Sequence, residues 1–364
     1  MIDTDMDGQV RKAAEIIRGG GVAAFPTETV YGLGASAFNE KAVARVFEIK
    51  RRPYFDPLIL HVGGLDWLDG LAVDIPEPAM ILIDRLWPGP LTVVLPKKPA
   101  VPDIATSGLP GVALRAPSND IARRLIDLAG APIAAPSANL FGSVSPTTAE
   151  HVREQLGASV DMVIDGGECS VGIESTIISF MGGKPVMLRP GGTPLEDIEE
   201  IIGKVTIPGH ADLVNQSPGR SVQHYATSVP LVLVKDASDI NNIGNIVIVN
   251  NGNIGDGDVN NGGKIPDNSR NHTGSVCHTE KVGLLAFSRN DTGIDERELP
   301  ANITQIEYLS SGGNLREAAC SLFAAMRRLD AAGVDVIAAL PVPNTGLGLA
   351  INDRLFRASM KRTI

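Results

Sequence analysis

The order of apolar and polar residues along the chain predicts alternating helices and short buried strands. Apolar residues at helical spacing predict helices over Gln9 to Arg18, Glu40 to Lys50, Pro76 to Leu86, Asn119 to Leu128 and Asn314 to Ala332. Capping boxes predict two more helix starts, at Thr147 to Glu150 and at Thr193 to Glu196. Short apolar runs predict strands at residues 22–25, 58–62, 91–95, 112–115, 162–164, 175–180, 186–188, 231–234, 246–249, 284–287 and 336–340. This alternation favours an α/β fold.

The chain divides into two predicted domains. A length of 364 residues exceeds what one core usually supports. We place a first, strand-rich domain at 1–205, a polar linker rich in Pro and Gly at 206–227, and a smaller parallel α/β domain at 228–364. Residues 250–279 are rich in Asn and Gly and cannot bury enough apolar surface to order themselves. We expect a tolerated surface insertion there, with a lid or docking loop as the alternative.

Composition narrows the possible partners. The formal net charge is −10, so a wide nucleic-acid surface is not expected, although a local basic pocket can hold a small anion. Cys169, Cys277 and Cys320 are too dispersed for a disulfide framework or a metal motif. The N-terminus lacks the pattern of a signal peptide and no apolar run approaches the ~20 residues of a membrane span. A cytoplasmic protein with no membrane contact is therefore expected.

Candidate chemistry gathers where predicted strands end. The chain has no P-loop and no nucleophile elbow, and its GLGLAI stretch is a poor dinucleotide fingerprint. Four polar segments instead carry Lys50, Arg52, Arg115 and Arg189, and strand ends are where α/β sheets bind ligands. Each cation alone also has a structural explanation, such as complementing a helix dipole or ending a strand in solvent. Together they predict a concave site for a small polyanion.

A series of motifs adds a family resemblance. FPTETVYGLG, KRRPYFDPLILHV, WPGPLT, VALRAP, PIAAPSAN, SPT, DGG, GIESTI and LRPG follow one another in the order typical of the YrdC-like family. With its linker and second domain, the chain resembles the longer, two-domain form, the L-threonylcarbamoyladenylate synthases. The resemblance is strong over roughly residues 8 to 227. It implies a twisted sheet with a positively charged cavity, followed by a Rossmann-like domain.

The resemblance also implies an activity. Enzymes of this family join L-threonine, bicarbonate and ATP, with Mg²⁺, into threonylcarbamoyl-AMP, pyrophosphate and water. A separate transferase complex then uses the product to modify an adenosine next to the tRNA anticodon. No stable contact of this chain with nucleic acid is implied. The implied class is a nucleotidyltransferase.

Site residues follow from the same motifs. The resemblance assigns threonine binding to Thr27, Tyr31, His61, Arg115, Ala135 and Ser175. It assigns ATP binding to Lys50, Arg52, Gly111, Ser137, Asn139, Ser145, Arg189 and Tyr225. Among these, Lys50, Arg52, Ser137 and Asn139 are implied to be catalytic, and no protein side chain is assigned to a metal.

Two departures and several rival functions accompany this assignment. The linker reads SPGRSVQHYAT, with Arg220, Gln223 and Thr227 where the family usually has Met, a basic residue and Pro. Asp56 stands where many members have Asn. The alternatives are an RNA-binding module, a second domain that senses a regulatory ligand, and a hydrogenase maturation factor. The last would need zinc-finger Cys pairs, which three scattered Cys do not supply.

Overall fold

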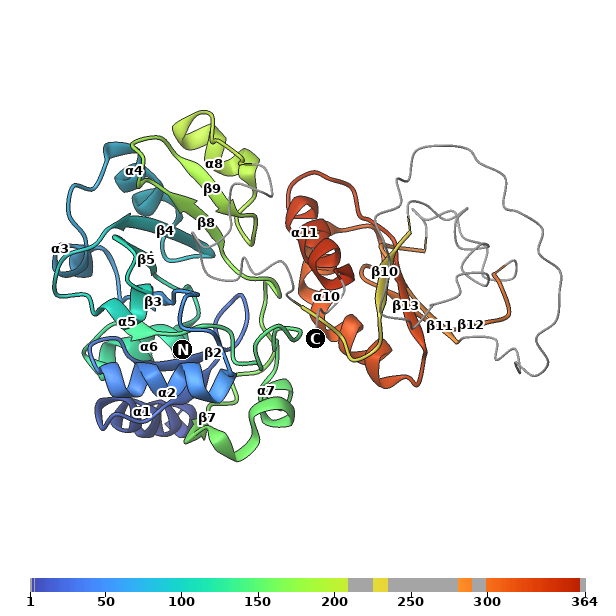
Figure 1. The fold of residues 1–364 in the computed structure, drawn as a ribbon, viewed down its shortest axis with the longest axis horizontal. Helices are drawn as coiled ribbons and strands as arrows, with labels where there is room; N and C mark the ends of the chain where they lie inside the picture. Colours follow the sequence, from blue (N-terminus) through green and yellow to red (C-terminus); the bar gives the residue numbers. More distant parts are fainter. Residues whose placement is uncertain (1, 3, 209–224, 235–280, 290–298, 361–364) are drawn as a thin grey trace, which may run out of the picture.

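Two β-sheets, one large and one small, organise the chain. The computed structural model describes residues 2, 4–208, 225–234, 281–289 and 299–360. Nine strands form the first sheet and four form the second, with helices α10 and α11 between the two (Figure 1). The predicted strand 246–249, the insertion 250–279 and most of the linker lie outside the described residues.

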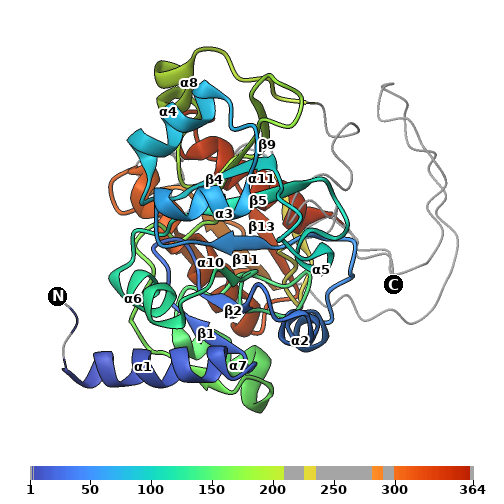
Figure 2. The same cartoon turned by 90° about the vertical axis from the view of Figure 1, so that its left-hand side faces the viewer.

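The first sheet is mixed, with the order β7-β1-β2-β6-β3-β5-β4-β8-β9. Its strands are β1 (Ala23–Phe25), β2 (Gly32–Ser36), β3 (Ile59–His61), β4 (Leu91–Pro96), β5 (Gly111–Arg115), β6 (Ile133–Ala134), β7 (Met162–Val163), β8 (Thr176–Ser179) and β9 (Val186–Arg189). The helices around it are α1 (Thr4–Arg18), α2 (Glu40–Lys50), α3 (Leu68–Leu71), α4 (Glu77–Leu86), α5 (Asp103–Thr106), α6 (Asp120–Ala129), α7 (Ala149–Leu156) and α8 (Leu195–Ile202). Figure 2 shows α1 and α7 at one end of the sheet and α4 and α8 at the other.

Helix boundaries follow side-chain caps where the sequence provides them. Asn39 caps α2 by accepting from the Ala42 N–H, and Asn119 caps α6 from two backbone N–H groups. The prediction for α7 was wrong by one residue, because Thr148 rather than Thr147 is the cap. Helix α8 has no side-chain cap, because its cap position is Pro194, whose side chain has no acceptor; the backbone of Thr193 bonds to the Thr176 hydroxyl. The capping boxes thus located both helices without fixing their first residue.

Strand β2 was missing from the prediction. The stretch FPTETVYGLG has no strand-like alternation, yet its second half pairs antiparallel with β1. A Cβ at Gly34 would lie 2.6 Å from Ile133 Cγ2 and 2.7 Å from Phe25 Cε1. A glycine is needed there because neighbouring side chains occupy the space of a Cβ. In the sequence alone, such a glycine indicates a turn.

The described residues of the second domain form a four-stranded sheet, which is parallel, as predicted. Its order is β10-β13-β11-β12, with β10 (Leu231–Leu233), β11 (Val282–Ala286), β12 (Ile303–Tyr308) and β13 (Val336–Ala339). Helices α10 (Leu315–Ala331) and α11 (Gly348–Ser359) cover the face that points to the first domain (Figure 1). Strand β12 and helix α11 were not predicted. Within the described residues, no helix is long and apolar enough to cross a bilayer.

A shared hydrophobic cluster joins the two domains. Val30, Val144 and Ile173 from the first domain pack in the same cluster as Phe323 and Ile351 from α10 and α11. The side chains of Ile173, Phe323 and Ile351 are fully buried. Because apolar burial contributes about 25 cal/mol per Å², this contact fixes the second domain against one wall of the first.

Gly172 lies at a close contact between the two domains, and its substitution measures how tightly they pack. It adopts φ +78°, and a Cβ there would lie 2.3 Å from the Cys320 Cα on α10. Gly167 has nearly the same φ, +79°, with open space around it. Gly167→Ala should therefore lower the free energy of unfolding by only about 1–2 kcal/mol, the left-handed backbone term. Gly172→Ala should lower it by clearly more, measured by urea denaturation, and equal losses would contradict the tight contact.

Candidate active site

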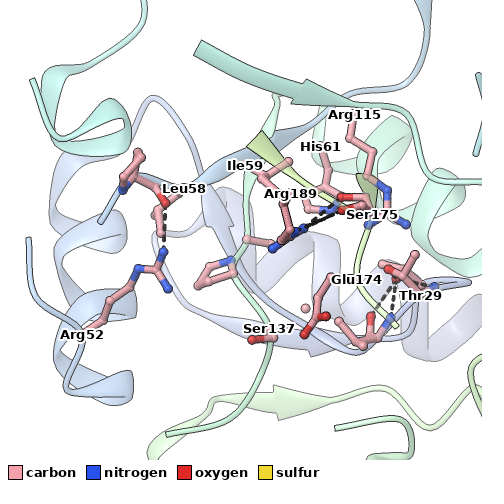
Figure 3. Close-up of a pocket in the computed structure, with 16 residues that line it drawn as sticks. Thr29, Arg52, Leu58, Ile59, His61, Arg115, Ser137, Glu174, Ser175 and Arg189 are labelled. Carbon is pink, nitrogen blue, oxygen red and sulfur yellow. Dashed lines mark hydrogen bonds between the residues drawn. The ribbon is translucent and has the colours of Figure 1, made fainter. Parts of the chain in front are cut away.

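A cavity opens where several strands of the first sheet end. Strands β3 and β5 run parallel, and their last residues, His61 and Arg115, are register partners. Strand β8 starts directly after Ser175, beside Arg189 at the end of β9. Of the predicted site residues, Thr27, Arg52, His61, Arg115, Ala135, Ser137, Ser175 and Arg189 line this one cavity (Figure 3).

Three of the four predicted cations reach the cavity. Arg52 lies near one end of the close-up and Arg115 near the other, with Arg189 between them (Figure 3). All three are at most 6% exposed. Guanidinium groups bind carboxylate and phosphate oxygens in pairs, so the arrangement suits a polyanionic ligand.

Arg115 is held by an acidic partner that the sequence analysis missed. Its Nη2 lies 2.7 Å from Glu28 Oε1, and both side chains are buried. Glu28 is the acid of the FPTETVYGLG stretch, one residue after Thr27. A buried arginine needs such a pairing, so Glu28 orients the guanidinium at the cavity wall.

His61 lines the same wall in its neutral form. Burial, reinforced by the nearby Arg115 charge, lowers the pKa of His61 from 6.5 to about 3. Its ring contacts Phe25 edge-to-face with centroids 6.0 Å apart. A neutral imidazole can donate or accept a hydrogen bond without adding charge.

Arg189 is tied to the start of strand β8. Its Nε and Nη2 donate to the Ser175 carbonyl at 3.1 and 2.9 Å, and Nη2 also donates to the Ser175 hydroxyl. The Ser175 hydroxyl also lies 2.7 Å from the Thr92 hydroxyl. Burial lowers the pKa of Arg189, although a guanidinium stays charged at neutral pH.

Arg52 is bound within its own loop. It donates through Nε to the Asp56 carbonyl at 3.0 Å and through Nη2 to the Pro57 carbonyl at 2.9 Å. Nη2 also pairs with Asp56 Oδ2 at 2.9 Å. The acid at this departure from the family pattern therefore faces the guanidinium and neutralises it.

Lys50 does not line the cavity. Its Nζ donates to the Ser137 and Asn139 carbonyls at 2.5 and 2.6 Å, and the side chain is 1% exposed. Burial, with the Arg52 charge nearby, holds the pKa of Lys50 well below its usual value. Both an amine and an ammonium have enough N–H groups for these two bonds. Lys50 therefore fixes the loop that presents Ser137.

Thr27 and Tyr31 shape the loop between β1 and β2. The Thr27 hydroxyl donates to the Val30 carbonyl at 2.7 Å and accepts from two backbone N–H groups of the same turn. Tyr31 points away from the cavity lining, and its hydroxyl donates to the Gly167 carbonyl and accepts from the Gly166 N–H. Tyr31 thus ties this loop to the DGG turn.

Asn139, Ser145 and Tyr225 also lie behind the lining. Asn139 donates to the Leu140 and Ser143 carbonyls, and Ser145 donates to Glu174 Oε1 at 2.6 Å. Tyr225 is fully buried, and its ring stacks on Phe323 of α10 with centroids 5.3 Å apart. Three predicted ligand contacts therefore belong to the support of the cavity in this structure.

Gly111 lines a second, more apolar cavity. Its other lining residues include Leu109, Ala113, Met181 and Leu188. Pro57 and Leu58 line both cavities, so the two are adjacent. The combined space offers a charged part and an apolar part next to each other.

Glu174 is the second acid that the sequence analysis missed. It precedes Ser175 in GIESTI and lines the cavity (Figure 3). Its Oε2 accepts from Nε and Nη2 of Arg354, on α11 of the second domain, at 3.1 and 3.0 Å. Only its place inside a recognised motif signalled this residue, and no local pattern signalled Arg354.

Fold and cavity together define the class of protein, an α/β enzyme with a basic site for small anionic substrates and a second parallel domain. The family model described as telomere recombination matches residues 15–191. The model described as threonylcarbamoyl-AMP synthase, C-terminal domain, matches residues 193–360.

Close relatives agree over the whole chain. The threonylcarbamoyl-AMP synthase of Pyrococcus abyssi is 41% identical over 98% of this chain and 95% of its own. That of Bacillus subtilis is 38% identical over the same shares. The crystal structure of P. abyssi Sua5 complexed with L-threonine superposes with a TM-score of 0.81 at 39% identity, covering 97% of this chain and 94% of the other. The chain belongs to the threonylcarbamoyl-AMP synthase family.

The neutral state of His61 predicts a pH effect on stability. The unfolded chain protonates this side chain near pH 6.5, but the folded chain does so only near about pH 3. Stability from this residue is therefore complete above pH 6.5 and is lost as the pH falls, by up to about 1.4 kcal/mol per pH unit. Urea denaturation between pH 4 and 8 should show a shallower dependence for His61→Gln than for the wild type.

A control separates His61 from other groups. The pKa of His151 is lowered to about 4, chiefly by burial, so it contributes a similar slope in both proteins. His151→Gln should remove the part of the pH dependence of stability that comes from His151 and leave the part that comes from His61. An unchanged slope in His61→Gln would show that His61 is charged in the folded state.

Proposed function

We propose that the two adjacent cavities of the first domain bind L-threonine, bicarbonate and ATP and form threonylcarbamoyl-AMP there, with release of pyrophosphate. The chain is a threonylcarbamoyl-AMP synthase, a nucleotidyltransferase that uses ATP and serves the threonylcarbamoyl modification of tRNA. The product passes to a separate tRNA threonylcarbamoyl transferase. The convergence of Arg52, Arg115 and Arg189 on one cavity carries the proposal for the site.

The reaction brings two anions together, which explains the need for these cations. The threonine ammonium first loses a proton to solvent, and the neutral amine then captures bicarbonate as a carbamate, with loss of water. A carbamate oxygen then attacks the α-phosphorus in line, and pyrophosphate leaves from the opposite side. Fixed guanidinium groups in a site of low dielectric lower the repulsion between carbamate and phosphate. The surrounding wall keeps bulk water from the carbamate and the mixed anhydride, which both hydrolyse readily.

We place the amino acid at the end of the cavity formed by β3, β5 and β8. Arg115 binds the threonine carboxylate through paired N–H groups, and His61 offers a neutral hydrogen-bonding partner beside it. Ser175, Ala135 and Thr27 complete the wall around the side chain. Tyr31 acts through the DGG turn that it holds.

We place the triphosphate between Arg52, Arg189 and Ser137. Lys50 and Asn139 act by fixing the Ser137 loop, and we keep Ser145 on the nucleotide side as a residue behind the lining. Gly111 lines the apolar cavity next door, which is suited to the nucleotide base. Tyr225 belongs to the same nucleotide side, at the end of the linker.

Mg²⁺ fits this site as an ion that arrives on the triphosphate. No cluster of three metal-binding side chains exists among the residues that the structure describes. Ser137 lines the cavity, and its hydroxyl is an oxygen ligand of the kind that Mg²⁺ accepts. Asn139 Oδ1 is buried behind this lining and has no hydrogen-bond partner within the described residues. Ser137 would hold an ion that keeps most of its phosphate and water ligands, and the ion would neutralise phosphate charge when bound.

We propose the domain roles on the same basis. Residues 1–205 form the catalytic domain, 206–227 the linker that folds over the site, and 228–364 a Rossmann-like domain. Support comes from the second sheet, which is entirely parallel, and from Ala226, whose N–H donates to the Gly142 carbonyl at 2.7 Å. The end of the linker is therefore anchored on the first domain.

Product identification tests the proposal directly. The chain is incubated with ATP, Mg²⁺, bicarbonate and each amino acid in turn, and the adenylate is identified by mass. Threonylcarbamoyl-AMP should form with L-threonine and should require bicarbonate. Formation of AMP or ADP alone under these conditions would contradict the proposed site chemistry.

Arg115→Lys should weaken the binding of threonine without weakening the binding of ATP. Lysine keeps the charge beside Glu28 but loses the paired N–H geometry. The KM for threonine should rise about 10- to 100-fold, because a hydrogen bond to a charged group contributes about 1.5–3 kcal/mol. Arg189→Lys is the matched control and should raise the KM for ATP instead. Steady-state pyrophosphate release measures both, and an exchange of the two effects would reverse the assignment.

Gly111→Val should weaken the binding of ATP and leave the binding of threonine unchanged. A Cβ at Gly111 would lie 2.9 Å from Met181 Sδ and 3.0 Å from Val94 Cγ1, so a valine fills part of the apolar cavity. We expect a Kd for the nucleotide at least about tenfold higher, the effect of roughly 1.4 kcal/mol, with threonine affinity unchanged. Isothermal titration with a non-hydrolysable ATP analogue measures this. Unchanged affinity would place the base elsewhere.

A further inference from the structure

One side chain of the second domain reaches the wall of the catalytic cavity. Arg354, on α11, is 0% exposed and lies against residues of the first domain. Its Nε and Nη2 donate to Glu174 Oε2 at 3.1 and 3.0 Å, and its Nη1 donates to the Pro190 carbonyl at 2.5 Å. Pro190 follows Arg189 directly. The guanidinium therefore joins the two motifs GIESTI and LRPG.

Glu174 is the acid of this wall. Among the described residues that line the cavity it is the one carboxylate, beside three arginines. Ser145 holds its Oε1 at 2.6 Å and Arg354 holds its Oε2, so both oxygens are fixed. In Figure 3 its carboxylate lies near Ser137 and Thr29, on the side of the cavity away from Arg115.

The chemistry of an amino acid explains an anion at this position. Threonine enters as a zwitterion, and Arg115 can take only its carboxylate. The amine needs an oxygen acceptor, and it must be turned toward the phosphates before it becomes a carbamate. A carboxylate that moved freely would repel the triphosphate instead, so its place and its charge have to be controlled.

We infer that Glu174 binds the amine of the amino-acid substrate and that Arg354 is the positioning residue that holds this carboxylate in place from the second domain. The inference rests on the proposed placement of threonine in this cavity. The second domain thereby completes the amino-acid site, although none of its described residues lines the cavity.

Arginine suits this position better than lysine. Its planar guanidinium donates hydrogen bonds to both Glu174 and the Pro190 carbonyl. The guanidinium also lies over the ring of Tyr225, with Cζ 5.6 Å from the ring centroid. A lysine ammonium would keep the charge but could not hold both partners in this geometry. The Arg354→Lys substitution therefore removes positioning while it retains the charge.

The test compares two arginines that cross the domain interface. Arg354→Lys breaks the paired contact with Glu174 and Pro190 but keeps the charge. Arg327→Lys is the matched control, because Arg327 donates from α10 to the Val144 carbonyl at 2.5 Å and does not contact Glu174. Pyrophosphate release is measured with full-length protein at varied threonine and at varied ATP, and thermal unfolding reports the fold of each variant.

Arg354→Lys should raise the KM for threonine about tenfold or more, with the KM for ATP within about twofold, as one lost charged contact predicts. Arg327→Lys should leave both values unchanged. Glu174→Gln should raise the KM for threonine as well. The double variant Glu174→Gln/Arg354→Lys should have a KM for threonine no higher than that of Glu174→Gln alone, because the two residues act as one unit.

Other outcomes overturn the inference. Equal effects of Arg354→Lys and Arg327→Lys, or additive effects in the double variant, would reduce Arg354 to a structural contact. A rise in the KM for ATP alone would assign Glu174 to the nucleotide. A wild-type protein that forms threonylcarbamoyl-AMP, with Arg115→Lys impaired for threonine, supports the proposed function whatever Arg354 does, so the two failures are distinguishable.

Discussion

Pairing of buried charges is the constraint on which this active site depends. A guanidinium or ammonium removed from water is stable only when oxygen atoms surround it. Arg115 meets Glu28, Arg52 meets Asp56, and Lys50 meets two loop carbonyls. Each pairing also fixes the orientation of the cationic side chain, because its partner belongs to the same part of the first domain. The cavity is therefore already shaped before the substrates bind, and the substrates add their charges to groups that are partly neutralised.

Local patterns predicted much of the fold and part of the site. Helix α2 begins and ends at the predicted residues, because Asn39 caps it and its apolar stripe is unbroken. Polar strand ends predicted that Arg115 and Arg189 would meet at one cavity, and both line it, since neighbouring strands bring their ends to one edge of a sheet. Lys50 was expected at the phosphates, but a residue at a helix end can turn inward, and here two carbonyls of the Ser137 loop accept its N–H groups.

Partners far apart in sequence could not be predicted in this way. Glu174 and Arg354 are separated by 180 positions, and neither a period nor a motif relates them. The stacking of the Tyr225 ring on Phe323 was not predicted either, because the second domain supplies that aromatic surface. Strand β2 was missed for the opposite reason, since Gly34 makes room for Phe25 and Ile133 rather than forming a turn. Such features depend on tertiary packing alone.

The same packing makes the two domains a single working unit. The loop after Pro26 places Val30 in the interdomain cluster while Thr27 and Thr29 of the same loop line the cavity. Ile173 enters that cluster directly before Glu174 and Ser175 reach the cavity. Because these apolar anchors alternate with the polar lining, a shift of α10 or α11 against the first domain would move residues of the site itself. The second domain therefore sets the geometry of the reaction through the backbone segments that both share.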